Sequence, residues 1–270
     1  MMMWYRALGF VASGRHLIGG IGRLLEIEKL EWRYMTFLKL SDYFSRLDGT
    51  TKRLELIDIL SHLYREIDSA DDARKVTYLL QGRVAAFYEP VEFGMAERLI
   101  ERAVGLGTGV DLLEVQRLNR QMGDLGKVVE EIGQDLRSNS QSNHLNTKSM
   151  TISEVFDELV RITNEKGEGS VERKVEILAG VIRGLDALSG KYVVRIVGGT
   201  LRLGVGDITI LEAMAVARLG DREYRKDLEK VYNEISDLGQ IAKALSQDKG
   251  QQFVEKRLGS VMSLGVSVDL

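Results

Sequence analysis

The segment TTKRLELIDILSHLYRE, residues 50–66, decides the fold class of this chain. Its apolar residues recur every three or four positions, at Leu54, Ile57, Leu60, Leu63 and Tyr64. Charged residues stand between them, so one face of the segment is apolar and the other is polar. This spacing predicts an amphipathic α-helix.

The same helical spacing returns in SVERKVEILAGVIRGL, residues 170–185. Strand-type alternation is scarce, and the one ambiguous run is Tyr192–Val197, which is rich in β-branched residues. Its helical flanks and short length favour a buried helix. Pro90 is the one proline against 28 glycines, which suits long helices that end at glycine. We therefore predict an all-α fold.

Residues 138–149, SNSQSNHLNTKS, are polar and without periodicity, which predicts a linker. Similar segments occur on its two sides in the same order: 50–60 with 170–180, 93–100 with 203–210, and 123–132 with 236–245. This degenerate repeat predicts two pseudo-twofold-related helical halves, about 35–137 and 150–268, with about a dozen helices in all.

The composition is that of a globular protein of 270 residues, 44% hydrophobic and 29% charged. Cysteine is absent and the three histidines are scattered, so we expect no disulfide and no metal site. No run of 18 apolar residues occurs, so we expect no membrane partner and a cytoplasmic location. We interpret residues 1–34 as an N-terminal extension produced by a start placed too early, with Met35 as the real start.

The net charge is −3, which by itself argues against a nucleic-acid binder. Residues 1–34 carry five basic against three acidic residues, so the remainder is more acidic than the whole. A DNA-binding role therefore requires that basic groups gather on one face.

Gly167, Gly169 and Ser170 precede the helix predicted near Val171. Ser170 is a good N-cap, and the glycines expose backbone N–H groups at the positive end of the helix, which suits a phosphate. Arg173 and Lys174 add positive charge one turn later. The alternative is a plain capped loop.

Thr51, Lys52 and Arg53 form the counterpart in the first half. Thr51 is a candidate cap, and the two basic side chains are candidates for phosphate contact. The alternative is a solvated first helical turn.

A second glycine-rich turn contains Gly199, Thr200, Arg202 and Gly204. Small residues let a backbone approach a sugar–phosphate edge, and an arginine can enter a minor groove. Helix punctuation is the alternative for the glycines. Gly82 and Arg83 are the weaker equivalents in the first half. Asp124 and Asp237 each precede Leu-Gly and a helix, which predicts helix caps.

Two stretches carry a family resemblance: GxGS-x-x-[RK]-K at 167–174 and KYVVRIVGGTLRLGVGDITILEAMA at 191–215, with LRLGVGD at 201–207 as its most specific part. They resemble the N-terminal domain of archaeal and eukaryotic-type ATP-dependent DNA ligases, and the likeness covers roughly 36–268. The resemblance implies an all-α domain that grips duplex DNA across the minor groove and helps to encircle a nick. It places a phosphate contact at Arg53. Many members have a basic residue where Thr200 stands, so one charge is missing here.

The resemblance also implies that the catalytic site of the ligase lies in other domains. Ligation begins at the lysine of Lys-x-Asp-Gly, and this motif is absent from the 270 residues; Arg46-Leu-Asp-Gly49 has arginine instead. We expect no catalytic residue here, and expect the nucleotidyltransferase and oligonucleotide-binding domains, with their ATP and Mg²⁺, to be absent.

The predicted function is therefore sequence-independent binding of nicked double-stranded DNA in replication, repair and recombination, near the nucleoid. The chain would be no enzyme on its own but part of a DNA ligase (ATP), EC 6.5.1.1, when joined to a catalytic domain encoded downstream. The alternative is a helical protein-interaction scaffold without DNA binding.

Overall fold

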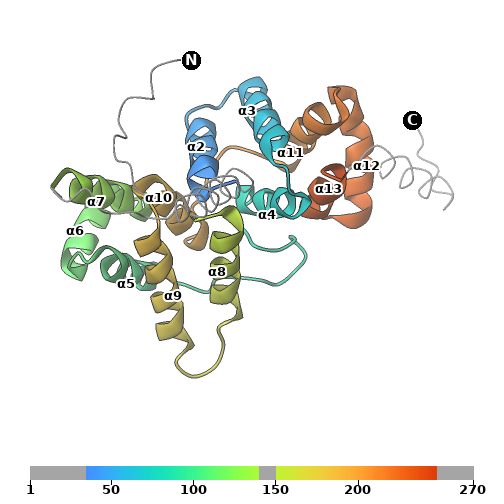
Figure 1. Ribbon diagram of the computed structural model, residues 1–270. Coiled ribbons are helices and arrows are strands. Elements are labelled where there is room, and N and C mark those ends of the chain that lie inside the picture. Colours follow the sequence, from blue (N-terminus) through green and yellow to red (C-terminus); the bar gives the residue numbers. More distant parts are fainter. Residues whose placement is uncertain (1–34, 140–149, 248–270) are drawn as a thin grey trace, which may run out of the picture. The chain divides into compact units, whose positions relative to one another are not determined.

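The computed structural model describes residues 35–139 and 150–247, which form twelve α-helices (Figure 1). The first six are α2 Phe37–Asp48, α3 Arg53–Glu66, α4 Ala70–Leu80, α5 Glu97–Thr108, α6 Leu112–Met122 and α7 Leu125–Asn139. The other six are α8 Ile152–Asn164, α9 Ser170–Gly184, α10 Ala187–Val197, α11 Asp207–Met214, α12 Arg225–Ile235 and α13 Leu238–Leu245. Between α11 and α12 lie a π-helical turn, η1 Ala215–Leu219, and a 3₁₀ turn, η2 Arg222–Tyr224.

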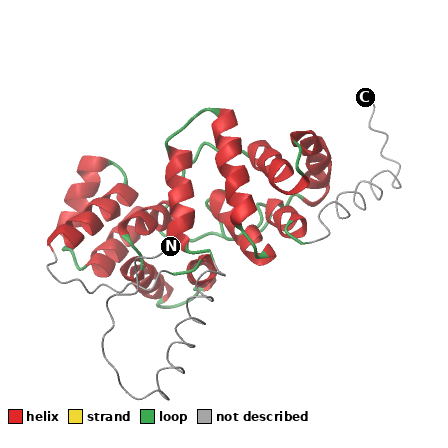
Figure 2. Ribbon diagram, turned by 45° about the horizontal axis from the view of Figure 1, so that its top comes forward, coloured by secondary structure: helices red, strands yellow, loops and turns green. Residues whose placement is uncertain are grey.

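Within these two ranges the chain has helices and loops and no strand, which confirms the all-α prediction (Figure 2). The predicted extension, most of the predicted linker and the residues after 247 lie outside the described residues. Helix α7 runs through Asn139 and so includes the first two residues of the predicted linker.

The helices pack crosswise between the two sides of the linker. Helix α3 packs against α11 and α5 against α9, while α4 packs against α13 and α7 against α10 (Figure 1). Each of these pairs joins a helix from before residue 140 to one from after residue 149. The two sides therefore share one core. The pairing also follows the sequence repeat: segment 50–60 matches 170–180 and segment 93–100 matches 203–210, so the pair α3–α11 corresponds to the pair α9–α5. A symmetry operation that relates the halves stays a prediction.

The two sides also meet at the starts of α2 and α8. Thr36 and Thr151 form an isolated antiparallel bridge, in which the Phe37 amide donates to the Met150 carbonyl at 2.8 Å and the Ile152 amide donates to the Met35 carbonyl at 3.1 Å. Each threonine also caps its own helix through its hydroxyl.

The ambiguous run Tyr192–Val197 belongs to α10, as predicted. Every residue of this run is buried, and the ring of Tyr192 meets Phe44 edge-on at 5.3 Å between centroids. Burial on all sides explains why the run lacks an amphipathic pattern: tertiary packing overrides the β-propensity of its valines.

The predicted apolar stripes need one correction. Leu54 and Val171 are exposed, and each is the second residue of its helix. The buried faces begin at Leu56 in α3 and at Val175 in α9. Ile208, second in α11, is exposed as well.

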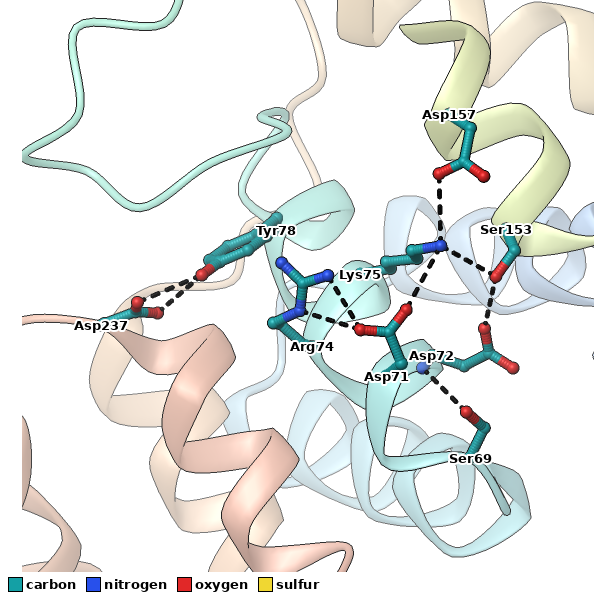
Figure 3. Close-up of polar contacts among 9 residues, drawn as sticks. All are labelled: Ser69, Asp71, Asp72, Arg74, Lys75, Tyr78, Ser153, Asp157 and Asp237. Carbon is teal, nitrogen blue, oxygen red and sulfur yellow. Dashed lines mark hydrogen bonds and ion pairs between the residues drawn. The ribbon is translucent and has the colours of Figure 1, made fainter. Parts of the chain in front are cut away.

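A polar cluster joins α4 to α8 (Figure 3). The buried Lys75 ammonium donates to the Ser153 hydroxyl at 3.0 Å and lies 3.3 Å from carboxylate oxygens of both Asp71 and Asp157. Ser153 in turn donates to the buried Asp72 at 3.0 Å, and burial raises the pKa of that carboxyl. A buried ammonium is stable only with such partners, so the cluster fixes how the two helices meet.

Asp124 and Asp237 cap α7 and α13, which confirms the prediction: the Gly126 amide donates to Asp124 at 2.9 Å and the Gln240 amide to Asp237 at 2.9 Å. Each aspartate also binds a side chain from the other side of the linker. Arg195 of α10 donates to Asp124 at 2.5 Å.

On the other cap, the hydroxyl of Tyr78 in α4 donates to Asp237 at 3.0 Å (Figure 3). Glycines allow these close approaches. A Cβ on Gly126 would lie 2.8 Å from Cγ of Arg195, and a Cβ on Gly239 would overlap the ring of Tyr78.

Candidate nucleic-acid interface

Four α-helices begin from a loop without a side-chain cap; α12 lacks one too, but it continues directly from the 3₁₀ turn η2. The N-cap residues of these four are Lys52 for α3, Ala96 for α5, Gly169 for α9 and Gly206 for α11, and none of the four provides a side-chain acceptor. Most of the other described helices have one, from residues Thr36, Ser69, Asp111, Asp124, Thr151, Asp186 and Asp237. The first-turn amides of Leu99, Ser170 and Thr209 donate to nearby backbone carbonyls, and the other first-turn N–H groups of the four helices remain for another acceptor. The helix dipole favours an anion there.

These four are the helices of the crosswise pairs α3–α11 and α5–α9. Each has one carboxylate in its first turn, which could compete with an incoming anion: Glu55, Glu97, Glu172 and Asp207. All four carboxylates already accept from other side chains, namely those of Lys52, Asn119, Arg102 and Tyr232. The carboxylates are thus held by those side chains.

The loop before α9 differs from the prediction in its cap. Gly167 and Gly169 have φ of +78° and +73°, and Gly169 is the N-cap. Ser170 is the first helical residue, and its amide donates to the Gly167 carbonyl at 3.2 Å. The prediction that Ser170 caps α9 is wrong, because the left-handed Gly169 turns the chain into the helix one residue earlier.

The two predicted basic residues after this loop are already bonded. Arg173 donates to the Glu165 carboxylate at 2.6 Å and to the carbonyls of Glu168 and Lys166 at 3.0 and 3.2 Å. Lys174 donates to the Phe93 carbonyl at 2.7 Å. Both side chains therefore hold loops in place, and a phosphate contact would have to add to these bonds or replace them.

The predicted cap of the first-half segment needs a similar correction. Helix α3 begins at Arg53, and its N-cap is Lys52, so the prediction that Thr51 caps it is wrong. The hydroxyl of Thr50 binds the Lys52 amide instead, at 3.2 Å. The Lys52 side chain is well exposed and pairs with Glu55 at 2.8 Å.

Arg53 reaches across to the other side of the linker. Its Nη2 donates to Oε2 of Glu212 in α11 at 2.7 Å, and Glu212 is buried. Glu212 also accepts from Arg222. Sequence reasoning found Arg53 but missed Glu212 and Arg222, because nothing local in the sequence links residues so far apart.

The glycine-rich turn between α10 and α11 is open. Gly199 and Gly204 have φ of +64° and +69°, and a Cβ on either would meet no atom within 4 Å. Thr200 and Arg202 are exposed. No described residue forms a hydrogen bond or ion pair with the Arg202 side chain, so its guanidinium is free. Thr200 and Arg202 line a cavity of about 510 Å³ together with Arg195.

Gly82 lies against this turn, since its Cβ position is 3.6 Å from Cβ of Leu201. Its φ of +68° lets the chain leave α4 there. Arg83, by contrast, serves its own loop: its guanidinium lies 4.8 Å from the centre of the Phe87 ring and donates to the carbonyls of Phe87 and Glu89 at 3.4 Å.

Contacts thus connect the four predicted segments. Arg53 binds α11, the start of α11 binds Gln81 through Asp207 at 3.1 Å, and Gly82 adjoins the turn at Leu201. Lys174 of the α9 segment binds Phe93, at the end of the loop that follows α4. Gly82 and the 199–204 turn touch directly, whereas Arg53 and Lys174 are linked to them indirectly, through α11 and through the loop after α4.

Within 35–139 and 150–247, no group of three or more histidines and acids is placed to hold a metal ion. None of the helices described there is both long and apolar enough to span a bilayer.

Comparison with known proteins decides the family. Residues 36–215 match the family described as DNA ligase N terminus. The chain belongs to this family. It is 43% identical over 209 residues to a probable DNA ligase of Dictyoglomus thermophilum, which covers 77% of this chain and 34% of that protein. It is 36% identical over 224 residues to a DNA ligase of Acidianus ambivalens, which covers 81% of this chain and 37% of the relative.

A third relative, DNA ligase 2 of Korarchaeum cryptofilum, is 35% identical over 227 residues, 83% of this chain and 37% of its own. The chain therefore spans about a third of the length of the curated relatives that it matches. Its membership of the family confirms the resemblance found in the motifs at 167–174 and 191–215.

Proposed function

We propose that this member of the DNA ligase N terminus family grips duplex DNA at a nick, without reading its sequence, as the DNA-clamping part of an ATP-dependent ligase. The observation that carries the proposal is the set of uncapped helix starts in α3, α5, α9 and α11. Backbone N–H groups at helix starts suit phosphate oxygens. The open turn that leads into α11 holds Arg202 and adds a free guanidinium.

Such contacts would explain binding without sequence preference. Phosphate contacts fix the position of a protein on the duplex but carry no sequence information. The exposed glycines Gly199 and Gly204 allow a backbone to approach a sugar–phosphate edge, and Arg202 supplies a side chain for the minor groove. The proposed interface therefore consists mainly of backbone N–H groups and arginines.

We further propose that ligation itself needs the catalytic part found in full-length ligases, with its ATP and Mg²⁺. The role of this chain is positioning: it holds the nick so that the catalytic part meets it in a productive geometry. We place this work in DNA replication, repair and recombination, in the cytoplasm near the nucleoid.

One observation favours a second function, a protein-interaction scaffold. Phe87 and Tyr88 are both exposed, next to each other, in the loop after α4. Large exposed aromatic side chains are typical of protein interfaces. The acidic net charge of −3 points the same way. The two functions differ in one simple observable, which is DNA binding at low salt.

The experiment compares two arginine variants in binding to a labelled nicked duplex. Arg202→Ala removes the free guanidinium, and Arg117→Ala is the matched control because Arg117 is exposed on α6 and bonded to its own helix neighbours, Glu114 and Gln121. A lost charge-assisted phosphate contact weakens binding by roughly tenfold or more. We expect that loss for Arg202→Ala and unchanged binding for Arg117→Ala. Equal affinity of both variants and the wild type would refute this interface.

A further inference from the structure

A groove between α3, α11 and the η2–α12 segment gathers four basic side chains. Its volume is about 420 Å³, and its basic residues are Arg53, Arg222, Arg225 and Lys226. The acids Glu212 and Glu223 also line it, and Ile208 forms an apolar edge. Positive side chains therefore outnumber negative ones around the groove.

Glu212 lies buried at the base of this arrangement and binds two arginines at once. Its Oε2 accepts from Arg53 at 2.7 Å, and its Oε1 accepts from Nε of Arg222 at 2.9 Å and also from Nη2 of Arg222. The Glu212 side chain is 4% exposed, whereas those of Arg53 and Arg222 are 59% and 56% exposed. One buried negative charge thus holds two positive groups whose outer parts face solvent.

Both guanidinium groups keep unused donors. A guanidinium has five N–H donors in a fixed plane. Arg53 uses only Nη2 with Glu212, and Arg222 uses Nε and Nη2, so Nε and Nη1 of Arg53 and Nη1 of Arg222 have no partner among the described residues. Planar arrays of free N–H groups match the oxygens of a phosphate.

The backbone after α11 is shaped so that Arg222 returns to Glu212, ten residues earlier in the chain. The π-helical turn η1 follows α11 directly, and Gly220 ends it with φ of +84°. Asp221 then caps η2, with the Glu223 amide donating to its carboxylate at 2.8 Å. Single π-helical turns inside helices are frequent at functional sites.

The other two basic side chains of the groove, Arg225 and Lys226, differ in their exposure and in their partners. Arg225 is partly buried and paired with Glu229 on its own helix. Lys226 is exposed, and no described residue forms a hydrogen bond or ion pair with it. Lys226 is therefore the free cation of the groove.

We propose that this groove binds a backbone phosphate of DNA through Arg53, Arg222 and Lys226, and that Glu212 is the positioning residue that orients the two guanidinium groups. The proposal rests on the proposed function, since it extends the DNA interface to a segment, 222–226, that lies beyond the matched family region. Arg53 then serves as a link between the α3 start and this groove.

The first test measures binding of a labelled nicked duplex over a range of salt concentrations. Arg222→Ala and Lys226→Ala should each weaken binding, by about tenfold for the arginine, and each should reduce the slope of log affinity against log salt by about 1. Arg117→Ala is again the control. Unchanged affinity and slope for both groove variants would overturn the proposal.

The second test separates positioning from simple charge. Glu212→Gln and Glu223→Gln remove the same charge from the same groove, but no described residue bonds the Glu223 carboxylate, whereas Glu212 holds both arginines. Electrostatics alone predicts tighter binding for both variants. Positioning predicts weaker binding for Glu212→Gln and equal or tighter binding for Glu223→Gln. Tighter binding of Glu212→Gln would contradict the role of Glu212.

The results also separate this inference from the proposed function. If the wild-type chain binds no duplex at low salt, both fail together. If Arg202→Ala weakens binding while Arg222→Ala and Lys226→Ala bind as the wild type does, only the groove is refuted. Circular dichroism of each variant checks folding, and Lys226→Ala keeps the test valid even if Glu212→Gln fails to fold, because Lys226 is exposed and unbonded.

Discussion

Substitution of Asp124 by alanine should destabilise the protein strongly, because this carboxylate does two things at once. It caps α7 through the amides of Gly126 and Lys127, at 2.9 and 3.3 Å. It also pairs with the buried Arg195, whose Nη2 and Nε donate at 2.5 and 3.1 Å. Both interactions are lost in Asp124→Ala.

The magnitude follows from these contacts. Loss of an aspartate cap costs about 1 kcal/mol. Removal of one partner of a buried ion pair costs about 3–5 kcal/mol when the other charge is left alone. Arg195 retains Asp48 at 3.0 Å, so we take about 2 kcal/mol for this part. The sum is about 3 kcal/mol, which for a domain of this size lowers Tm by roughly 6–12 °C.

Urea denaturation followed by circular dichroism measures the change. Asp124→Asn is the matched variant: asparagine caps a helix as well as aspartate does, so only the ionic part of about 2 kcal/mol should be lost. Glu114→Ala, which removes an exposed pair on α6, is the control and should not change the midpoint. A loss below about 1 kcal/mol for Asp124→Ala would refute the reasoning.

Three further predictions test other parts of the account. Gly239→Ala should destabilise the protein by about 1–3 kcal/mol, since its Cβ would overlap the ring of Tyr78, whereas Gly180→Ala, which meets no atom within 4 Å on α9, should stabilise it by about 0.5–1 kcal/mol; thermal melts decide. Acid should destabilise the wild type more steeply than Asp124→Asn. Burial alone would raise the pKa of Asp124, but hydrogen bonds and charge from Arg195 and the backbone amides lower it below its ordinary value. That stability is present above the unfolded pKa of about 3.9 and is lost as pH falls through the folded pKa, so parallel curves between about pH 5 and 3 would contradict the assignment. Finally, incubation of the chain with α-labelled ATP and Mg²⁺ should give no covalent adenylate, because a lysine nucleophile in Lys-x-Asp-Gly is missing and arginine cannot replace it; an acid-stable label would reveal an active site that we have overlooked.

Local sequence predicts a helix cap correctly only where the helix starts at the expected residue. Asp124 and Asp237 are caps as expected, because a short acidic side chain before a helix has few other uses. Ser170 and Thr51 are not, because the helix start shifts by one residue when a left-handed glycine or an extended lysine precedes it. Helix type is thus easier to predict than its first residue.

The apolar pattern predicts the core well except at the first turn. Leu54 and Val171 fit the helical period but stand ahead of the buried faces. Leu38 and Leu113, each second in a capped helix, are exposed as well, so the misfit is a property of the first helical turn and does not mark the proposed interface.

Apart from Arg53, the groove residues could not be predicted. Glu212 has no motif around it, and its two partners are reached only when α3 packs on α11 and when the π-helical turn brings Arg222 back. A buried carboxylate between two arginines depends on tertiary packing, which periodicity does not encode. Arg173 and Lys174, in contrast, were found by charge and proximity to glycine, but their existing bonds to Glu165 and Phe93 emerge only from the structure.

The most direct test of the central claim is a salt titration of duplex binding with two unrelated DNA sequences. If about five phosphates are neutralised, log affinity should fall against log salt with a slope of about −4 to −5, and the two sequences should bind alike. A slope near zero, or a strong preference for one sequence, would contradict a clamp that holds the DNA backbone.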